Sequence, residues 1–144
     1  MLPFCSCSEK GSELFVQLSH HQTKINFSND IPLNDDLNIL NYIYYFNGGG
    51  VAAGDINNDG FIDLYFSGNQ VSSRLYLNEG NLKFRDITAT SFTKTTDWAS
   101  GVTMADVNAD GWLDIYVCRA GSPDPEKRSN LLFINRKNNT FEEM

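Results

Sequence analysis

The chain has 144 residues, and its 11 basic and 18 acidic side chains give a formal net charge of −7. A chain of this length fits one small domain or a piece of a larger protein. The acidic excess and the scattered cations disfavour nucleic acid as a partner, because phosphate groups repel carboxylates. No apolar run approaches the ~18 residues that a membrane helix needs, so the sequence predicts no transmembrane segment.

Residues 1–10 contain a motif that bears on location. The run FCSCSEK resembles the end of a bacterial lipoprotein signal, with Cys7 as the residue that would carry the lipid. Too few residues precede Cys7 for the basic start and the apolar core of a secretory signal. Two interpretations stay open, a shortened lipoprotein signal followed by a linker, or a coincidence. The first would place the protein at the cell surface, for instance as an outer-membrane lipoprotein anchored at Cys7.

Residues 11–48 are expected to form the strands of a partial sheet. Apolar runs at 14–18, 25–27 and 40–46 are typical of short strands, and the Asp-rich stretch 29–38 between them predicts a polar loop.

Two copies of one pattern fill the rest of the chain, at residues 49–98 and 99–144. Residues 50–65 align without a gap with residues 101–116, and LYLN at 75–78 matches LFIN at 132–135. Short β-branched and aromatic runs between Gly, Asn and Asp clusters predict four strands in the first copy, at 51–54, 64–67, 74–78 and 83–88. The second copy predicts the same strands, the last of them cut short at Met144.

The sequence therefore predicts an all-β fold. A four-stranded unit of ~40 to 50 residues has the size of a β-propeller blade, and propellers close as rings of roughly four to eight blades. Two blades and an N-terminal partial blade cannot close a ring. We therefore expect a partial β-propeller and a chain that is a fragment of a longer protein.

Each copy carries the acidic pattern DxNxDGxxD between its first two strands. Oxygen-bearing side chains at positions 1, 3, 5 and 9, a glycine at 6 and a carbonyl at 7 match the first nine positions of a calcium loop. So many hard oxygen ligands suit Ca²⁺ better than Mg²⁺, which requires a stricter octahedron. The sequence predicts two calcium sites. Their ligands are Asp55, Asn57, Asp59, the Phe61 carbonyl and Asp63, and Asp106, Asn108, Asp110, the Trp112 carbonyl and Asp114.

A metal-free turn is the alternative, because Asp-Gly forms hairpin turns without any ion. Three clustered carboxylates would repel one another by as much as ~4 kcal/mol per pair at 4 Å with an effective dielectric of ~20, and a turn has no use for that cost. The recurrence of the whole set in both copies favours the metal. A helix-loop-helix hand is disfavoured, since its twelfth position is Phe66 or Val117 rather than Glu.

The repeated segments GVAAGDINNDGFIDLYFSGN and GVTMADVNADGWLDIYVCRAG resemble the FG-GAP and VCBS-type repeats of integrin-α-like β-propellers, over about residues 49–144. The resemblance implies one calcium ion in the hairpin between the first two strands of each blade, held by the ligands named above. It also implies an extracellular or cell-surface protein. Asn58 and Ala109 stand where many members have Gly, at a position that supplies no side-chain ligand.

The sequence contains no recognisable catalytic constellation, so we expect that the chain is not an enzyme. Its paired carboxylates belong to the expected cation sites, and the adjacent His20 and His21 would point to opposite faces of a strand. Propeller loops favour recognition of a protein or a glycan, as in adhesion, with calcium in a structural role. Trp98 is either a stacking residue for such a ligand or part of the core. The alternative is a non-catalytic part of a secreted polysaccharide-degrading or other enzyme whose active site lies outside this chain.

Overall fold

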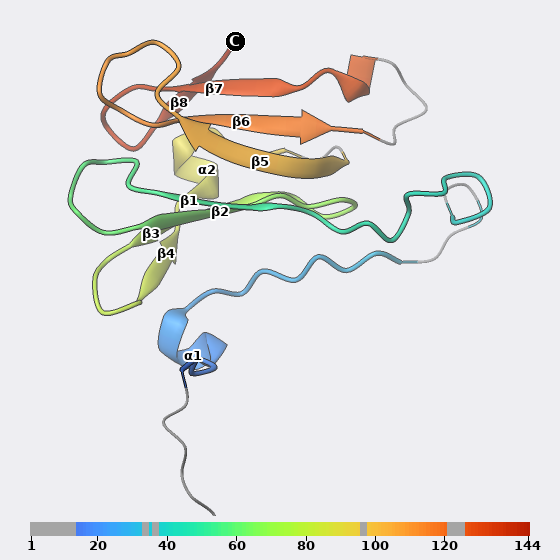
Figure 1. Ribbon diagram of the computed structural model, residues 1–144, viewed down its shortest axis with the longest axis horizontal. Coiled ribbons are helices and arrows are strands. Elements are labelled where there is room, and N and C mark those ends of the chain that lie inside the picture. The colour runs from blue at the N-terminus through green and yellow to red at the C-terminus, as the bar shows by residue number, and fades with distance from the viewer. Residues whose placement is uncertain (1–13, 33–34, 36–37, 96–97, 121–125) are drawn as a thin grey trace, which may run out of the picture.

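The computed structural model describes residues 14–32, 35, 38–95, 98–120 and 126–144, and it contains two four-stranded antiparallel sheets (Figure 1). The first sheet has the order β1-β2-β3-β4, and the second has the order β5-β6-β7-β8. Each sheet is a meander in which consecutive strands pair, so each repeat forms a separate sheet. The strands of the first sheet are β1 (Val51–Gly54), β2 (Asp63–Phe66), β3 (Arg74–Asn78) and β4 (Phe84–Asp86). Those of the second sheet are β5 (Ala99–Ala105), β6 (Asp114–Arg119), β7 (Leu131–Asn135) and β8 (Phe141–Glu143).

The expected all-β character and the four strands of each repeat are confirmed. Among the described residues, helical structure is confined to the short segments α1 (His20–Thr23) and α2 (Thr88–Ser91) and the 3-10 turn η1 (Glu126–Arg128). Within the described part of the chain, no helix has the length and hydrophobicity to cross a membrane.

The two sheets stack face to face, with β1 lying beside β5 (Figure 1). Ala52, Tyr65 and Leu75 are paired across the first sheet, so they share the face that is buried in the core. Ile115 and Phe133 contribute to the same core from the second sheet. Burial of these aromatic and aliphatic side chains is the main stabilising contribution to the stack.

Glycine permits the close approach of β1 to the second sheet. A Cβ atom on Gly50 would lie 3.0 Å from Gly101 Cα, which is backbone and cannot move aside cheaply. A Cβ atom on Gly54 would lie 2.6 Å from a methyl carbon of Leu113. Gly50 therefore permits the close backbone approach of the two sheets, and Gly54 leaves room for the Leu113 side chain.

The expected N-terminal strands are wrong, because the structure contains no strand among the described residues before β1. Local hydrogen bonds replace sheet pairing there. The Ser19 N–H and hydroxyl donate to the Gln22 side chain at the start of α1, and the Asn38 carbonyl accepts the N–H of Tyr42 within a run of turns. The prediction of a partial blade in this region therefore loses the strands on which it was based.

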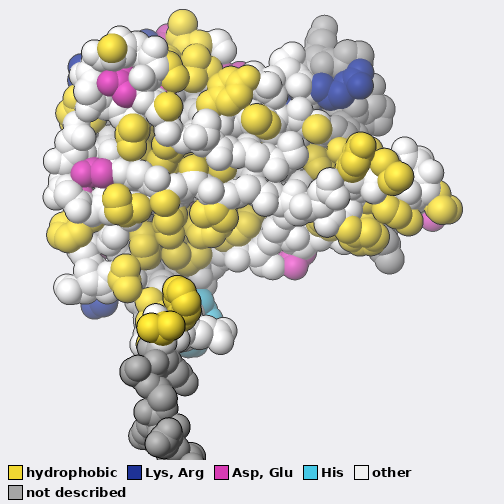
Figure 2. Space-filling model, viewed as in Figure 1, with side chains coloured by type: hydrophobic (Ala, Val, Ile, Leu, Met, Phe, Trp, Pro, Cys, Tyr) yellow, Lys and Arg dark blue, Asp and Glu magenta, His cyan; other side chains and the backbone are white. Residues whose placement is uncertain are grey.

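The N-terminal segment instead lies against the outer face of the first sheet. The Phe27 ring stacks on Phe66 with ring centroids 5.2 Å apart, and the Asn26 N–H donates to the Tyr76 hydroxyl at 3.2 Å. Further along, residues 38–46 form a projecting lobe that carries hydrophobic side chains at its surface (Figure 2). The expected lipid-anchor residue Cys7 and the rest of residues 1–10 lie outside the described residues.

Candidate metal centre

The first acidic loop, residues 55–62, joins β1 to β2 and wraps around the Asp55 carboxylate. Asp55 Oδ1 accepts the Asp59 N–H at 3.1 Å, and Asp55 Oδ2 accepts the Gly60 N–H at 2.8 Å. Gly60 has φ +87°, a left-handed conformation that favours glycine and turns the chain back toward β2. The Asn57 side-chain oxygen accepts the same Asp59 N–H at 3.2 Å. The loop thus brings the oxygens of positions 1 and 3 to one point.

Position 5 of this loop is tied to positions 3 and 7. Asp59 Oδ1 accepts the Phe61 N–H at 2.8 Å, and its second oxygen accepts a bond from the Asn57 amide nitrogen at 2.9 Å. The bond to Phe61 fixes the residue whose carbonyl is the expected position-7 ligand.

Position 9 of the first loop, Asp63, is fully buried where β2 begins. Its carboxylate accepts the Ile56 N–H at 3.0 Å and the Asn78 N–H at 2.8 Å, so it links the loop to β3. Burial raises the pKa of Asp63, and the nearby charges of Asp59 and Asp55 act in the same direction, against the two N–H donors. The two loop carboxylates, Asp55 and Asp59, therefore lie close enough to Asp63 to disfavour its ionised form.

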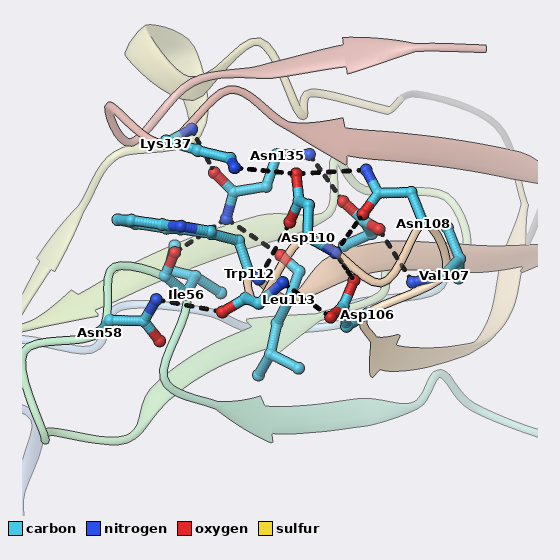
Figure 3. A network of polar contacts seen from close by, with 12 residues as sticks. Ile56, Asn58, Asp106, Val107, Asn108, Asp110, Trp112, Leu113, Asn135 and Lys137 are labelled. Atoms are coloured by element: carbon cyan, nitrogen blue, oxygen red, sulfur yellow. Dashed lines mark hydrogen bonds and ion pairs between the residues drawn. The ribbon is translucent and has the colours of Figure 1, made fainter.

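The second acidic loop, residues 106–113, repeats this hydrogen-bond pattern between β5 and β6 (Figure 3). Asp106 accepts the N–H groups of Asp110 at 3.0 Å and of Gly111 at 2.8 Å. The Asn108 side-chain oxygen accepts the Asp110 N–H at 3.0 Å. The remaining members repeat too: Asp110 accepts the Trp112 N–H, and the buried Asp114 accepts the N–H groups of Val107 and Asn135.

Two asparagines that the sequence analysis did not single out hold the loops in place. Asn78 and Asn135 end β3 and β7, and both are buried. The Asn78 amide donates to the Ile62 carbonyl at 3.0 Å, and the Asn135 amide donates to the equivalent Leu113 carbonyl at 3.0 Å. Their recurrence in LYLN and LFIN was the available signal, but a donor to a backbone carbonyl has no partner side chain that could reveal it in the sequence.

The second loop also has a cationic neighbour. The Lys137 ammonium lies 3.3 Å from Asp110 Oδ2 (Figure 3). The pKa of Asp110 is lowered, because partial desolvation, which raises it, is outweighed by the Trp112 N–H and by Lys137.

In both repeats the side-chain oxygens of positions 1, 3 and 5 accept N–H groups of their own loop. Position 9 lies at the start of the next strand, where its carboxylate accepts one N–H from the loop and one from the third strand. Within the described residues, no group of three or more His, Cys, Asp and Glu side chains is arranged to hold a metal ion. The donor chemistry nevertheless fits a hard cation, because every expected ligand is an oxygen and the carboxylate oxygens have further lone pairs. Calcium binding by these residues stays a prediction.

Trp98, for which either ligand stacking or core packing was expected, belongs to the core. Its side chain is only 5% exposed. The ring lies edge-on to Tyr42, with centroids 5.3 Å apart, and 5.6 Å from the Tyr45 ring. It is therefore not available to stack on a ligand in this structure.

Two stacked four-stranded sheets, each with the same acidic loop between its first two strands, define a β-sheet repeat protein. Residues 55–117 match the family model of the FG-GAP-like repeat, a little under half of the chain, from the first acidic loop into β6. The match confirms, over residues 55–117, the predicted resemblance to FG-GAP-type repeats. No curated protein shows significant similarity to it.

Proposed function

We propose that this chain is part of an extracellular β-propeller that binds calcium for structural purposes and recognises a protein or a glycan. The observation that carries the proposal is the recurrence of one loop architecture, with most of its hydrogen bonds, at the same place in two stacked sheets. A turn does not need carboxylates at positions 1, 5 and 9, whereas a hard divalent cation uses them as ligands, and both copies carry all three.

The faces of the two sheets support a propeller. Ala52, Tyr65 and Leu75 of the first sheet are covered by the second sheet, and their repeat equivalents are Thr103, Tyr116 and Leu132. These equivalents lie on the outer face of the second sheet, where Tyr116 is 37% exposed while Tyr65 is fully buried. The outer face of the second sheet is therefore built like a face that another sheet covers, as in a ring of blades.

A calcium ion would be held by Asp55, Asn57, Asp59, the Phe61 carbonyl and Asp63 in the first loop. Asp106, Asn108, Asp110, the Trp112 carbonyl and Asp114 would hold the second ion. When bound, the ion supplies positive charge that offsets the repulsion between the carboxylates. Because position 9 in each loop also bonds the N–H of an asparagine at the end of the third strand, the site would join three strands of its sheet.

The expected gain in stability is modest. Extracellular calcium modules have dissociation constants of ~10⁻⁴ to 10⁻³ M. Calcium at ten times its dissociation constant stabilises the folded state by only ~1.4 kcal/mol per site.

The projecting lobe of residues 38–46 supports a role in recognition (Figure 2). Its large apolar side chains include Leu40, 94% exposed, and Ile43, 75% exposed. Exposed apolar patches of this kind are typical of interaction surfaces.

Thermal unfolding in calcium and in chelator, together with calorimetric titration of calcium, tests the metal. We expect two ions per chain and a higher melting temperature in calcium. Asp59→Ala and Asp110→Ala should each remove about one equivalent, whereas Glu143→Gln, which removes a negative charge from an exposed position of β8, should remove none. Unchanged melting together with no heat of binding would refute calcium binding.

Arrays of soluble glycans and extracellular proteins, read beside an assay for release of reducing ends from polysaccharides, test the recognition role. We expect binding without release. Release by the purified chain would contradict a non-catalytic module.

A further inference from the structure

The two repeats differ in the second residue after the asparagine that ends the third strand. The second repeat has Lys137 two residues after Asn135, and the first repeat has Gly80 two residues after Asn78. The Lys137 N–H donates to the Asn135 side-chain oxygen at 2.8 Å, and the Gly80 N–H donates to that of Asn78 at 3.0 Å. Both residues have left-handed backbone, with φ +65° and +87°. The two positions are thus equivalent in the backbone and differ in the side chain.

That side chain reaches an expected calcium ligand. Lys137 Nζ lies 3.3 Å from Asp110 Oδ2, at position 5 of the second loop. The corresponding oxygen of the first loop, Asp59 Oδ2, accepts a bond from the neutral Asn57 amide at 2.9 Å. The equivalent Asn108 amide lies at 3.3 Å from Asp110 Oδ2, so this oxygen has an added cationic partner.

We propose that Lys137 is an intramolecular competitor of the divalent cation in the second loop, so that the two loops bind calcium with unequal affinity and the first loop fills first. This inference rests on the proposed calcium binding. A divalent ion that enters the second loop must either displace the ammonium from Asp110 or bind beside it. Displacement of the ammonium and binding beside it each cost free energy, and calcium binding to the first loop has no such cost. Lys137 would then partly neutralise the second loop where calcium is scarce.

Coulomb's law gives the size of the effect. The ammonium is half exposed, so a water-like dielectric applies, and a single and a double charge a few ångströms apart then repel enough to weaken binding about tenfold. High salt should reduce the difference, because the screening length falls to about 3 Å at 1 M salt, which is comparable with the separation of these exposed charges.

Calorimetric titration of the whole chain with calcium chloride at low salt tests the proposal. The wild type should show two classes of site whose dissociation constants differ about tenfold. Asp59→Ala should remove the tight class, which assigns it to the first loop. Lys137→Gln should tighten the weak class about tenfold, while Lys83→Gln, which removes an exposed cation outside both loops, should change neither class.

The reciprocal substitution Gly80→Lys gives an independent measurement. A Cβ atom at Gly80 would make an ordinary 3.6 Å contact with the Phe61 ring. The φ of +87° strains any side chain at this position, and lysine occupies the same left-handed region, at φ +65°, in the second repeat. We expect the first loop to weaken about tenfold. If Lys137→Gln fails to fold, this variant carries the test alone.

Two results would overturn the inference, and they are distinguishable. Two equal sites that neither substitution changes would refute the role of Lys137 and leave the proposed calcium function intact. The absence of calcium binding in the wild type and in Lys137→Gln alike would refute both.

Discussion

The first acidic loop lies against the second repeat, whereas the second acidic loop faces outward. Ile56 in the first loop is 1% exposed, and Val107 at the same place in the second loop is 52% exposed. The Ile56 carbonyl accepts a hydrogen bond from the Asn135 amide at 2.8 Å, and the Asn58 amide donates to the Gly111 carbonyl at 3.1 Å (Figure 3). The second repeat thus supports the first loop from outside, and only the second loop relies chiefly on its own hydrogen bonds.

The same sequence motif therefore has different surroundings in the two repeats of one molecule. In the first loop, packing and inter-repeat hydrogen bonds hold the backbone in addition to the bonds within the loop. In the second loop, an exposed residue replaces the buried one and Lys137 supplies a positive charge. Substitutions at equivalent positions of the two loops should therefore have unequal effects.

The largest expected effect is that of Ile56→Ala. Truncation of a buried isoleucine costs about 3 kcal/mol, because it removes apolar contacts and leaves a cavity. Val107→Ala should change the free energy of unfolding by no more than about 0.5 kcal/mol, since Val107 is mostly in solvent. Urea denaturation of the two variants measures both values. Equal losses would show that the two loops have the same environment in solution.

Asn135→Ala should rank second, at about 2 kcal/mol. It removes the amide that donates to the Ile56 carbonyl and to the Leu113 carbonyl, and it leaves buried acceptors without that donor. The matched variant Asn78→Ala removes a bond within its own repeat, to the Ile62 carbonyl, and should cost about 1 kcal/mol. Denaturation curves distinguish the two. A larger loss for Asn78→Ala would contradict a link from Asn135 to the first loop.

The repeats were predictable from the sequence because their signals are local. Alternating apolar residues between Asn, Asp and Gly clusters define the strands, and the spacing of DxNxDGxxD places the loops. The N-terminal runs at 14–18 and 40–46 have the same apolar character, but the local bonds of Ser19 and Asn38 hold their surroundings in turns. The contacts of Asn135 and Lys137 with the loops were not predictable, because they depend on how the strands come together.

Alkaline pH should reduce stability through ionisation of a tyrosine on the covered face and not through its equivalent on the outer face. Burial raises the pKa of Tyr65 to about 12, although hydrogen bonds with Ser73 and Thr95 act in the opposite direction. Since the folded state favours the neutral phenol, this stabilisation is complete below pH ~10 and is lost as the pH rises toward 12. The loss should reach about 1 kcal/mol at pH 11.

Urea denaturation at pH 8 and at pH 11 measures this loss. Tyr65→Phe should abolish the part of the alkaline destabilisation that comes from this phenol. Tyr116→Phe, at the exposed equivalent position, should retain it. An undiminished loss in Tyr65→Phe would assign the alkaline sensitivity to other groups.

The smallest expected effect concerns the left-handed residue of each loop. Asn58 and Ala109 both have φ +58°, a conformation that costs a residue with a Cβ atom about 1 kcal/mol. Ala109→Gly removes this cost. Glycine also has greater conformational entropy in the unfolded chain, which offsets part of the gain, so we expect a net stabilisation of about 0.5 kcal/mol. Asn58→Gly should instead destabilise by about 0.5 kcal/mol, because asparagine tolerates this conformation and its amide bonds the Gly111 carbonyl.

Differential scanning of the two glycine variants in chelator, so that metal binding does not contribute, should show melting temperatures displaced in opposite directions by about 2 °C. The two changes in melting temperature have opposite signs because the side chains and their contacts differ, since the two residues share one backbone conformation. Displacement of both variants upward would mean that the Asn58–Gly111 bond contributes nothing in solution, and the first loop would then depend on Ile56 and Asn135 for its support.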